Sequence, residues 1–299
     1  MDHIAFLGVG AMGLGMAGNL AKAGQRVVAF DLSSEALARA KAAGCETAAS
    51  AAAAVKDADV VITMLQTAAQ VRSVYAEAVL PHAAKGALVV DCSTIDVETA
   101  RAVAADAVAA GLRPADAPVS GGVGGAEAGT LTFMVGCEAA FFPTVQQRLS
   151  PMAKTVAHAG GSGAGQAAKI CNNMVLGVSM LAVCEAFALA ERLGLEPERF
   201  FEIASQSSGQ CWSLTSYCPW PGPVPAAPSN RGYQGGFLSA LMLKDLKLAQ
   251  EAAAKSGATT PMGAQAEATY ALFDRLGHGG KDFSAVLQLL RGRLDELGP

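Results

Sequence analysis

The chain has 299 residues, of which 52% are hydrophobic and 16% are charged, and its formal net charge is −4. This length and composition predict a compact protein with room for two domains and exclude a disordered chain. The slight acidic excess, without a stripe of lysine and arginine, argues against a nucleic-acid partner. The longest uncharged apolar run, residues 170–184, contains two asparagines and is too short to cross a bilayer, so no membrane partner is expected.

The cysteines and histidines suggest neither a metal site nor a disulfide framework. The seven cysteines include no C-x-x-C pair, and the four histidines are scattered along the chain. Reduced thiols suit a reducing compartment. The first expected strand begins at Ile4, so no cleavable signal peptide is expected. We therefore expect bacterial cytoplasm, or the mitochondrial matrix if a transit peptide has been removed.

Short apolar strands alternate with helices through the first half of the chain. The expected strands are residues 4–7, 26–30, 60–65, 87–91, 113–118 and 131–135. Ser33 or Ser34 is expected to cap a helix that runs to Lys41. Continuous apolar strands separated by helices predict a parallel sheet with helices on both faces, which is an α/β fold.

The second half reads as helical. One long helix is expected over residues 166–194, Pro197 begins another, and helical patterns recur at 240–256, 261–276 and 283–296. We therefore expect a Rossmann-type nucleotide-binding domain at 1–163 and an all-helical domain at 164–299, which begins with a long interdomain helix. A helix so long and apolar needs partners on several sides, which favours a homo-oligomer, either a dimer or a tetramer.

The first strand leads into Gly8-x-Gly10-x-x-Gly13, which opens a helix. Glycines there let the backbone approach a pyrophosphate, which the helix N-terminus then binds. Asp31 ends the second strand, where a carboxylate accepts hydrogen bonds from ribose hydroxyls and repels a 2′-phosphate. No arginine follows it in residues 32–34. This pattern predicts NAD as the cofactor, rather than NADP.

Two later segments are candidates for substrate chemistry. Backbone N–H groups around Ser120, Gly121 and Gly122 suit a small carboxylate, although a plain flexible loop explains the glycines equally well. Lys169 and Asn173 lie one helical turn apart, so they share a face. A lysine can accept the proton of an alcohol while hydride leaves to nicotinamide. The alternative for this pair is a solvated lysine and an asparagine bonded to backbone.

Four motifs together resemble those of the β-hydroxyacid dehydrogenase family along essentially the whole chain. They are GVGAMG at 8–13, DAPVSGG at 116–122, the segment 161–173 that contains Lys169, and KDL at 244–246. The resemblance implies that Lys169 is the acid/base and that Asn173 supports it. It implies a substrate site of Ser120, Gly121, Gly122, Trp212, Phe237 and Asp245, with Asp245 paired with Lys169 or Lys244. It implies a cofactor site of Gly8, Gly10, Ala11, Met12, Gly13, Asp31, Leu65, Gln66, Thr94 and Lys244.

Within that family, the chain is most similar to members that oxidise 3-hydroxyisobutyrate to methylmalonate semialdehyde with NAD, a step of valine breakdown. The segments GQCWSLTSYCPWPG and APSNRGYQGGF carry this finer resemblance. One alternative is a family member that acts on tartronate semialdehyde, glyoxylate or succinic semialdehyde. Another alternative is a non-catalytic regulatory protein that binds a nucleotide.

Overall fold

A computed structural model describes residues 3–298, and the chain divides into two compact units, Met1–Lys169 and Ile170–Pro299. The first unit contains two clusters of buried apolar side chains, and the second contains one. Each unit therefore has a hydrophobic core of its own.

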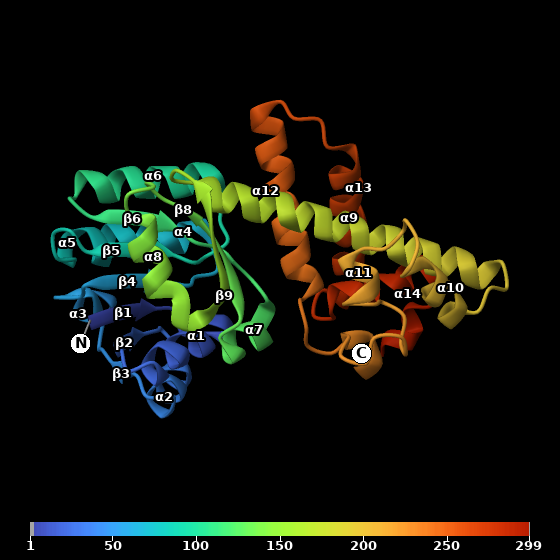
Figure 1. The fold of residues 1–299 in the computed structure, drawn as a ribbon, viewed down its shortest axis with the longest axis horizontal. Helices are drawn as coiled ribbons and strands as arrows, with labels where there is room; N and C mark the ends of the chain where they lie inside the picture. The colour runs from blue at the N-terminus through green and yellow to red at the C-terminus, as the bar shows by residue number, and fades with distance from the viewer. Residues whose placement is uncertain (1–2, 299) are drawn as a thin grey trace. The chain divides into compact units, whose positions relative to one another are not determined.

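The first unit is built on one sheet (Figure 1). Within residues 3–298 the strands follow the order β3-β2-β1-β4-β5-β6-β8-β7, and β9 pairs with β8. They are β1 (His3–Leu7), β2 (Arg26–Phe30), β3 (Glu46–Thr47), β4 (Val60–Thr63), β5 (Leu88–Asp91), β6 (Arg113–Asp116), β7 (Val119–Ser120), β8 (Leu131–Gly136) and β9 (Ala153–Gly160). The strands from β1 to β6 pair in parallel, which confirms the expected α/β fold.

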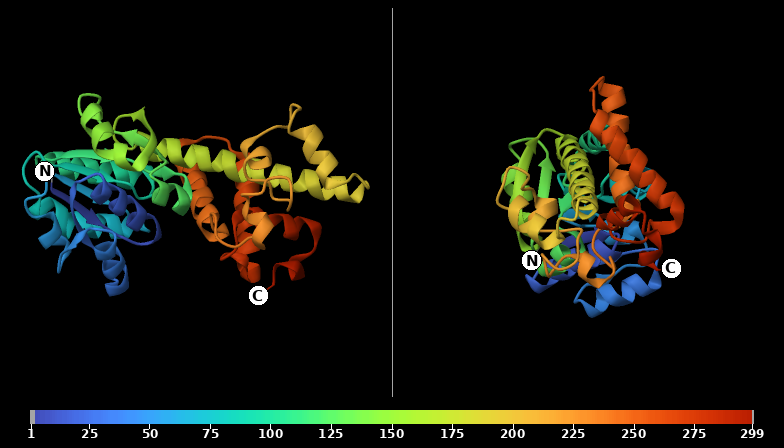
Figure 2. Two further views of the ribbon diagram at one scale, coloured as in Figure 1. Left: turned by 60° about the horizontal axis from the view of Figure 1, so that its bottom comes forward. Right: turned by 90° about the vertical axis from the view of Figure 1, so that its right-hand side faces the viewer.

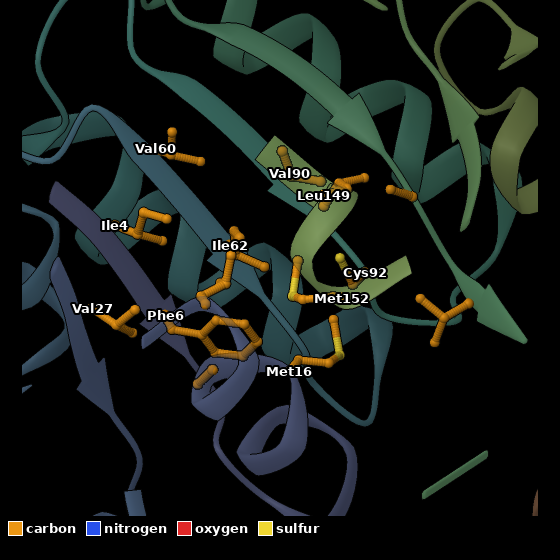
Figure 3. Packing of buried hydrophobic residues seen from close by; sticks show 14 of the residues in the cluster. Ile4, Phe6, Met16, Val27, Val60, Ile62, Val90, Cys92, Leu149 and Met152 are labelled. Carbon is orange, nitrogen blue, oxygen red and sulfur yellow. The ribbon is translucent and has the colours of Figure 1, made fainter. Parts of the chain in front are cut away.

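Helices cover both faces of this sheet because successive strand residues point to opposite sides. Ile4 and Phe6 pack with α1, α2 and α8, whereas Ala5 and Leu7 pack with α3, α4 and α6. Figure 3 shows the first of these faces, where Phe6 lies close to Met16 and Ile62. The helices are α1 (Ala11–Lys22), α2 (Ser34–Ala42), α3 (Ala51–Val55), α4 (Ala68–Val74), α5 (Leu80–His82), α6 (Val97–Ala109), α7 (Gly122–Ala128) and α8 (Phe142–Leu149).

The far end of the sheet differs from the expected parallel pattern. Strand β8 runs antiparallel to β6 and β7, and β9 pairs in parallel with β8. Between β7 and β8 the chain has room only for the seven-residue helix α7. A parallel crossover needs a dozen or more residues, so the chain must return antiparallel here.

The second unit is helical, as expected. Its helices are α9 (Ala164–Arg192, whose residues up to Lys169 belong to the first unit), α10 (Pro197–Ala204), α11 (Trp212–Thr215), α12 (Ser239–Ser256), α13 (Pro261–Phe273) and α14 (Val286–Arg291). The expected long helix is confirmed as α9, which has 29 residues and is drawn as one continuous helix in Figure 2. Helices α12 and α13 lie side by side.

The helix expected over 283–296 is wrong as a single element. A 3₁₀ turn (Phe283–Ala285) precedes α14, and a second 3₁₀ turn (Leu294–Leu297) follows it. Gly292 separates α14 from the second turn with a φ of 72°. Glycine in this left-handed conformation is the usual helix terminator, so the helical period continues in the sequence while the helix stops.

The core of the second unit is assembled around α9. Phe187 is fully buried on α9, together with Tyr270 from α13 and Met242 from α12. A Cβ at Gly177 would press on Leu246, so α9 and α12 approach closely at this glycine. Among residues 3–298, α9 is the one helix long and apolar enough to cross a membrane by length and composition. The core helices of soluble proteins pass the same test, so the feature is weak evidence for a membrane span.

Candidate active site

The turn between β1 and α1 is shaped by its glycines. Gly8 has a φ of 94°, and a Cβ there would strike the backbone that follows β4. A Cβ on Gly13 would strike the carbonyl oxygen of Gly8, whereas one on Gly10 would meet no atom within 4 Å. The first N–H groups of α1, at Ala11 and Met12, have no acceptor within the helix. Internal packing thus requires glycine at two positions, and the open side of Gly10 fits the pyrophosphate of a dinucleotide.

Asp31 directly follows β2 and is held by the backbone on both sides. Its Oδ2 accepts a hydrogen bond from Val9 N at 2.9 Å, and its Oδ1 accepts one from Ser33 N at 2.9 Å. A carboxylate has about four lone-pair sites, so both oxygens can still accept a ligand hydroxyl. The next side chain, Leu32, is 94% exposed. The carboxylate is therefore fixed beside the glycine turn.

Three of the expected cofactor residues follow the ends of β4 and β5. Leu65 N donates to Ser93 Oγ at 2.8 Å, which ties the two strand ends together. Gln66 N donates to Gln70 Oε1 at 3.0 Å, and Gln66 as a residue is exposed. Thr94 lies half-buried in the loop after β5. Leu65 and Thr94 therefore both lie at the carboxyl edge of the sheet, because Ser93, which precedes Thr94, accepts the hydrogen bond from Leu65 N.

Two carboxyl groups are buried at the same edge. Asp91 and Asp116 face each other in the register of β5 and β6. Asp91 Oδ1 accepts hydrogen bonds from Thr63 Oγ1 at 2.7 Å and from Ser93 Oγ at 2.6 Å. Burial raises the pKa of Asp91 to about 6, although these hydrogen bonds act to lower it. Burial also raises the pKa of Asp116, against the lowering effect of backbone N–H donors such as Gly163 N.

The loop expected to bind a carboxylate leaves the sheet at β7. Ser120 is half-buried and pairs with Thr132 of β8. Gly121 and Gly122 follow with φ values of 133° and 62°, and α7 begins at the second of them. Such positive φ values turn successive N–H groups toward one side, which is how backbone forms a concave anion site.

Lys169 lies on α9 six residues into the helix and is 7% exposed. Asn173 comes one turn later on the same helix and is also buried. Its Nδ2 donates to Asp245 Oδ2 on α12 at 2.5 Å. Lys244 Nζ lies 3.9 Å from the other oxygen of Asp245. In the second unit, the structure thus brings Asn173, Lys244 and Asp245 together. The approach of Lys244 to Asp245 is one of the two pairings expected for that carboxylate, whereas the bond from Asn173 was not predicted.

The expected aromatic residues of the substrate site also lie in the second unit. Trp212 is 51% exposed at the start of α11 and stacks on Tyr217 with ring centroids 4.9 Å apart. Phe237 meets Phe283 edge-on at 5.8 Å. Tyr217 Oη donates to Asp282 Oδ2 at 2.8 Å, and Phe237 N donates to the same oxygen at 2.8 Å. Asp282 therefore joins the two aromatic groups through one buried carboxylate.

Sequence reasoning missed three buried polar side chains that organise these regions, namely Ser93, Gln166 and Asp282. Gln166 lies inside the motif that contains Lys169, and its polarity in an otherwise small and apolar stretch was the available signal. Asp282 precedes Ser284 with the spacing of an Asx turn, in which it accepts a hydrogen bond from Ser284 N at 2.9 Å. Ser93 has one near partner, Asp91, but its bonds to Leu65 and Gln166 come from distant segments, which the local sequence does not indicate.

Two family models cover most of the chain. Residues 3–161 match the NAD binding domain of 6-phosphogluconate dehydrogenase, and residues 163–290 match the NAD-binding domain of NADP-dependent 3-hydroxyisobutyrate dehydrogenase. The chain belongs to the β-hydroxyacid dehydrogenase family. This β-hydroxyacid dehydrogenase is an NAD(P)-binding oxidoreductase that acts on a small hydroxyacid.

Individual relatives extend the match to nearly the full chain. The structure of Mycobacterium tuberculosis 3-hydroxyisobutyrate dehydrogenase with L-serine is 48% identical, covers 97% of this chain and 99% of that one, and gives a TM-score of 0.94. The NAD-dependent L-serine dehydrogenase of Pseudomonas aeruginosa is 47% identical and covers 97% of this dehydrogenase and 98% of that protein. The mitochondrial 3-hydroxyisobutyrate dehydrogenase of Drosophila melanogaster is 44% identical over 97% of this chain and 89% of its own.

Proposed function

We propose that this dehydrogenase oxidises 3-hydroxyisobutyrate to methylmalonate semialdehyde with NAD, as in valine breakdown. The observation that carries the proposal is Lys169, a buried lysine at the position of the family's catalytic motif. The full-length similarity to 3-hydroxyisobutyrate dehydrogenases supports the choice of substrate.

The reaction divides between the cofactor and Lys169. NAD, when bound, accepts the hydride that leaves the hydroxyl-bearing carbon of the substrate. Lys169 Nζ, as the neutral amine, accepts the hydroxyl proton, so that the oxygen becomes the carbonyl oxygen of the aldehyde. Proton transfer to a positioned side chain of this kind contributes about 10²- to 10⁴-fold to the rate.

The other residues of the motifs bind and orient the substrate in this proposal. N–H groups of Gly121 and Gly122, with the Ser120 hydroxyl, bind its carboxylate. Asn173 orients the reacting oxygen, and its amide is itself held by Asp245. Lys244 contributes positive charge beside Asp245 on the cofactor side. Trp212 and Phe237 supply an apolar wall for the methyl branch.

The preference for NAD over NADP rests on Asp31. Its fixed carboxylate accepts hydrogen bonds from the ribose hydroxyls and repels the 2′-phosphate of NADP. The residues that follow, Leu32 to Ser34, contain no cation that offsets this repulsion. We therefore expect kcat/KM to be higher with NAD, and we expect Asp31→Ala to narrow the difference.

A second candidate substrate is L-serine. An NAD-dependent L-serine dehydrogenase is 47% identical to this chain, and the related Mycobacterium tuberculosis structure contains L-serine. Serine has the same carboxylate and primary alcohol as 3-hydroxyisobutyrate, with an ammonium in place of the methyl group. The same lysine chemistry applies to both, so the groups around Trp212 and Phe237 decide between them.

The test is reduction of the cofactor by the purified protein, measured as NADH formed from NAD or NADPH formed from NADP. The substrates are 3-hydroxyisobutyrate, L-serine, glycerate and 4-hydroxybutyrate in turn. Among these pairs of substrate and cofactor, we expect the highest kcat/KM with 3-hydroxyisobutyrate and NAD. Lys169→Ala is expected to lower kcat by about 10³-fold while NADH binding is retained. Lys154→Ala, which removes an exposed lysine from β9, is the matched control and should leave turnover unchanged.

Each other outcome has a defined meaning. Preference for L-serine keeps the role of Lys169 and replaces the substrate. Preference for glycerate or 4-hydroxybutyrate identifies a semialdehyde-type member of the family. NADH binding without turnover of any hydroxyacid identifies a nucleotide-binding regulator and overturns the proposal.

We also propose that the protein is a homo-oligomer. Several large apolar side chains near the end of α9 and on α10 are more than half exposed in the single chain, namely Leu189, Leu193 and Ile203. Large apolar side chains that are exposed in a single chain are covered when they lie in an interface between subunits.

We propose that the protein works in bacterial cytoplasm, or in the mitochondrial matrix. The relatives of this chain include bacterial and mitochondrial proteins.

A further inference from the structure

The first turn of α9 is tied to the sheet by a buried carboxylate. Asp116 Oδ1 accepts a hydrogen bond from Gly163 N at 2.6 Å, and its Oδ2 accepts one from Gln166 N at 2.9 Å. Free N–H groups at a helix start favour a negative partner. Asp116 therefore caps α9 from β6 and sets where this helix begins relative to the sheet.

The side chain of Gln166 makes a second connection from the same turn. It is fully buried, and its Nε2 donates to the carbonyl oxygen of Ser93 at 2.7 Å. Its Oε1 accepts a hydrogen bond from Ile95 N at 3.2 Å. One amide thus binds the backbone on both sides of Thr94. Only a side chain with both a donor and an acceptor can satisfy these two backbone groups.

The backbone bound by Gln166 carries the expected nicotinamide-side residues. Ser93 Oγ accepts a hydrogen bond from Leu65 N at 2.8 Å and donates to Asp91 at 2.6 Å. Lys169 follows Gln166 by three residues, so the two lie about 4.5 Å apart along the helix axis and are neighbours on its surface. Gln166 thus belongs to the helical turn that precedes Lys169, and its side chain binds the backbone on both sides of Thr94.

We propose that Gln166 is a positioning residue that fixes Lys169 relative to the Ser93–Ile95 backbone, and so relative to the nicotinamide of the bound cofactor. This inference rests on the proposed function, in which Lys169 accepts the proton and Thr94 lies beside the cofactor. Misplacement of reacting groups by about 1 Å can cost about 10²-fold in rate. Loss of the Gln166 amide should therefore reduce the chemical step more than the binding of either ligand.

The test compares Gln166→Met with Gln288→Met. Gln288 is a second buried glutamine, whose amide bonds to Tyr233 and Arg291 in the second unit, so the same substitution is matched in size and burial. We expect Gln166→Met to lower kcat by about 10- to 100-fold, with KM and the NADH Kd within about threefold of wild type. The deuterium isotope effect on kcat, with substrate labelled at the carbon that loses hydride, should rise. Gln288→Met should leave kcat and the isotope effect unchanged.

Gln166→Glu keeps the proposal testable if Gln166→Met does not fold. The glutamate retains the length and the oxygen that faces Ile95 N. It replaces the donor to Ser93 with a second oxygen and adds a negative charge. It should lower kcat and raise the isotope effect in the same way. Gln166 variants with wild-type kcat and isotope effect, or with losses equal to those of Gln288→Met, would overturn the positioning role. The proposed function fails separately, if wild-type protein oxidises no hydroxyacid.

Discussion

The two units differ in how completely they cover their apolar side chains. In the first unit, helices enclose both faces of the sheet, and three large apolar side chains among residues 3–169 are exposed, namely Leu32, Val108 and Val123. In the second unit the exposed set is Val175, Leu189, Leu193, Leu195, Ile203, Trp212, Leu238, Leu241, Met262, Leu272 and Leu276. The helical unit thus leaves more large apolar side chains exposed than the sheet unit does, as expected if the proposed homo-oligomer forms through the helical unit.

One carboxyl group from each unit shows how its surroundings set its pKa, and Asp91 and Glu191 are shifted in opposite directions. The first unit holds Asp91 with hydroxyl and backbone donors, and burial raises its pKa to about 6. The second unit pairs Glu191 with Arg291 at 2.7 Å, and this hydrogen-bonded pair lowers the pKa of Glu191. The two carboxyl groups therefore contribute to stability in opposite directions as pH changes.

The largest expected effects test whether the two cores are separate. Phe133→Ala in the sheet unit and Phe187→Ala in the helical unit each remove a fully buried ring. Each should lower the free energy of unfolding by about 3–5 kcal/mol. In calorimetry, separate cores predict two transitions, of which each variant lowers a different one. A single transition that both variants shift equally would show that the units unfold as one.

Asp91→Asn should change how stability depends on pH. Because the folded pKa is raised from 3.8 to about 6, the contribution of Asp91 is present below its unfolded pKa and is lost as pH rises through the folded pKa. The wild type should lose about 3 kcal/mol relative to Asp91→Asn between about pH 4 and pH 7. Urea unfolding across this range measures the difference. Asp106→Asn, an exposed site on α6, is the control and should show no such trend.

A charge on the exposed apolar surface of the second unit should weaken assembly. Leu193→Glu places a carboxylate on a side chain that is 75% exposed in the single chain. We expect association to weaken by about tenfold or more, or about 1.4 kcal/mol, in sedimentation measurements over a range of concentrations. Val108→Glu makes the same change on the first unit and should leave assembly intact. Equal behaviour of the two variants would contradict the contrast between the units.

The smallest expected effect concerns the ion pair of the second unit. Arg291 donates two hydrogen bonds to Glu191, at 2.9 and 2.7 Å. Because the pKa of Glu191 is lowered, its contribution is present above the unfolded pKa and is lost as pH falls through the folded pKa. Glu191→Gln should cost at most about 1 kcal/mol near neutral pH, and this cost should disappear in acid. Glu46→Gln, which breaks the more exposed pair with Arg26 in the first unit, should have a smaller effect.

The local character of most elements could be predicted because it depends on nearby residues. The strand periods, the cap at Ser33 and the helix start at Pro197 all appear in the structure. The sequence did not predict β9, whose residues are mostly exposed and lack a clear apolar pattern. It did not predict the antiparallel return at β8 either, because strand direction follows from the length of a connection that only the structure defines.

The sequence by itself determined the family, the α/β order of the first unit and the candidate residues, since glycine turns, strand ends and helical spacing are local properties of the chain. Only the tertiary structure showed that Asp116 caps α9, that Gln166 binds both sides of Thr94, and that Asp282 joins Tyr217 to Phe237. The physical reason is that a buried polar group must find its partner wherever the fold brings one within reach. These partners lie between 45 and 73 residues apart, a separation at which no sequence period acts.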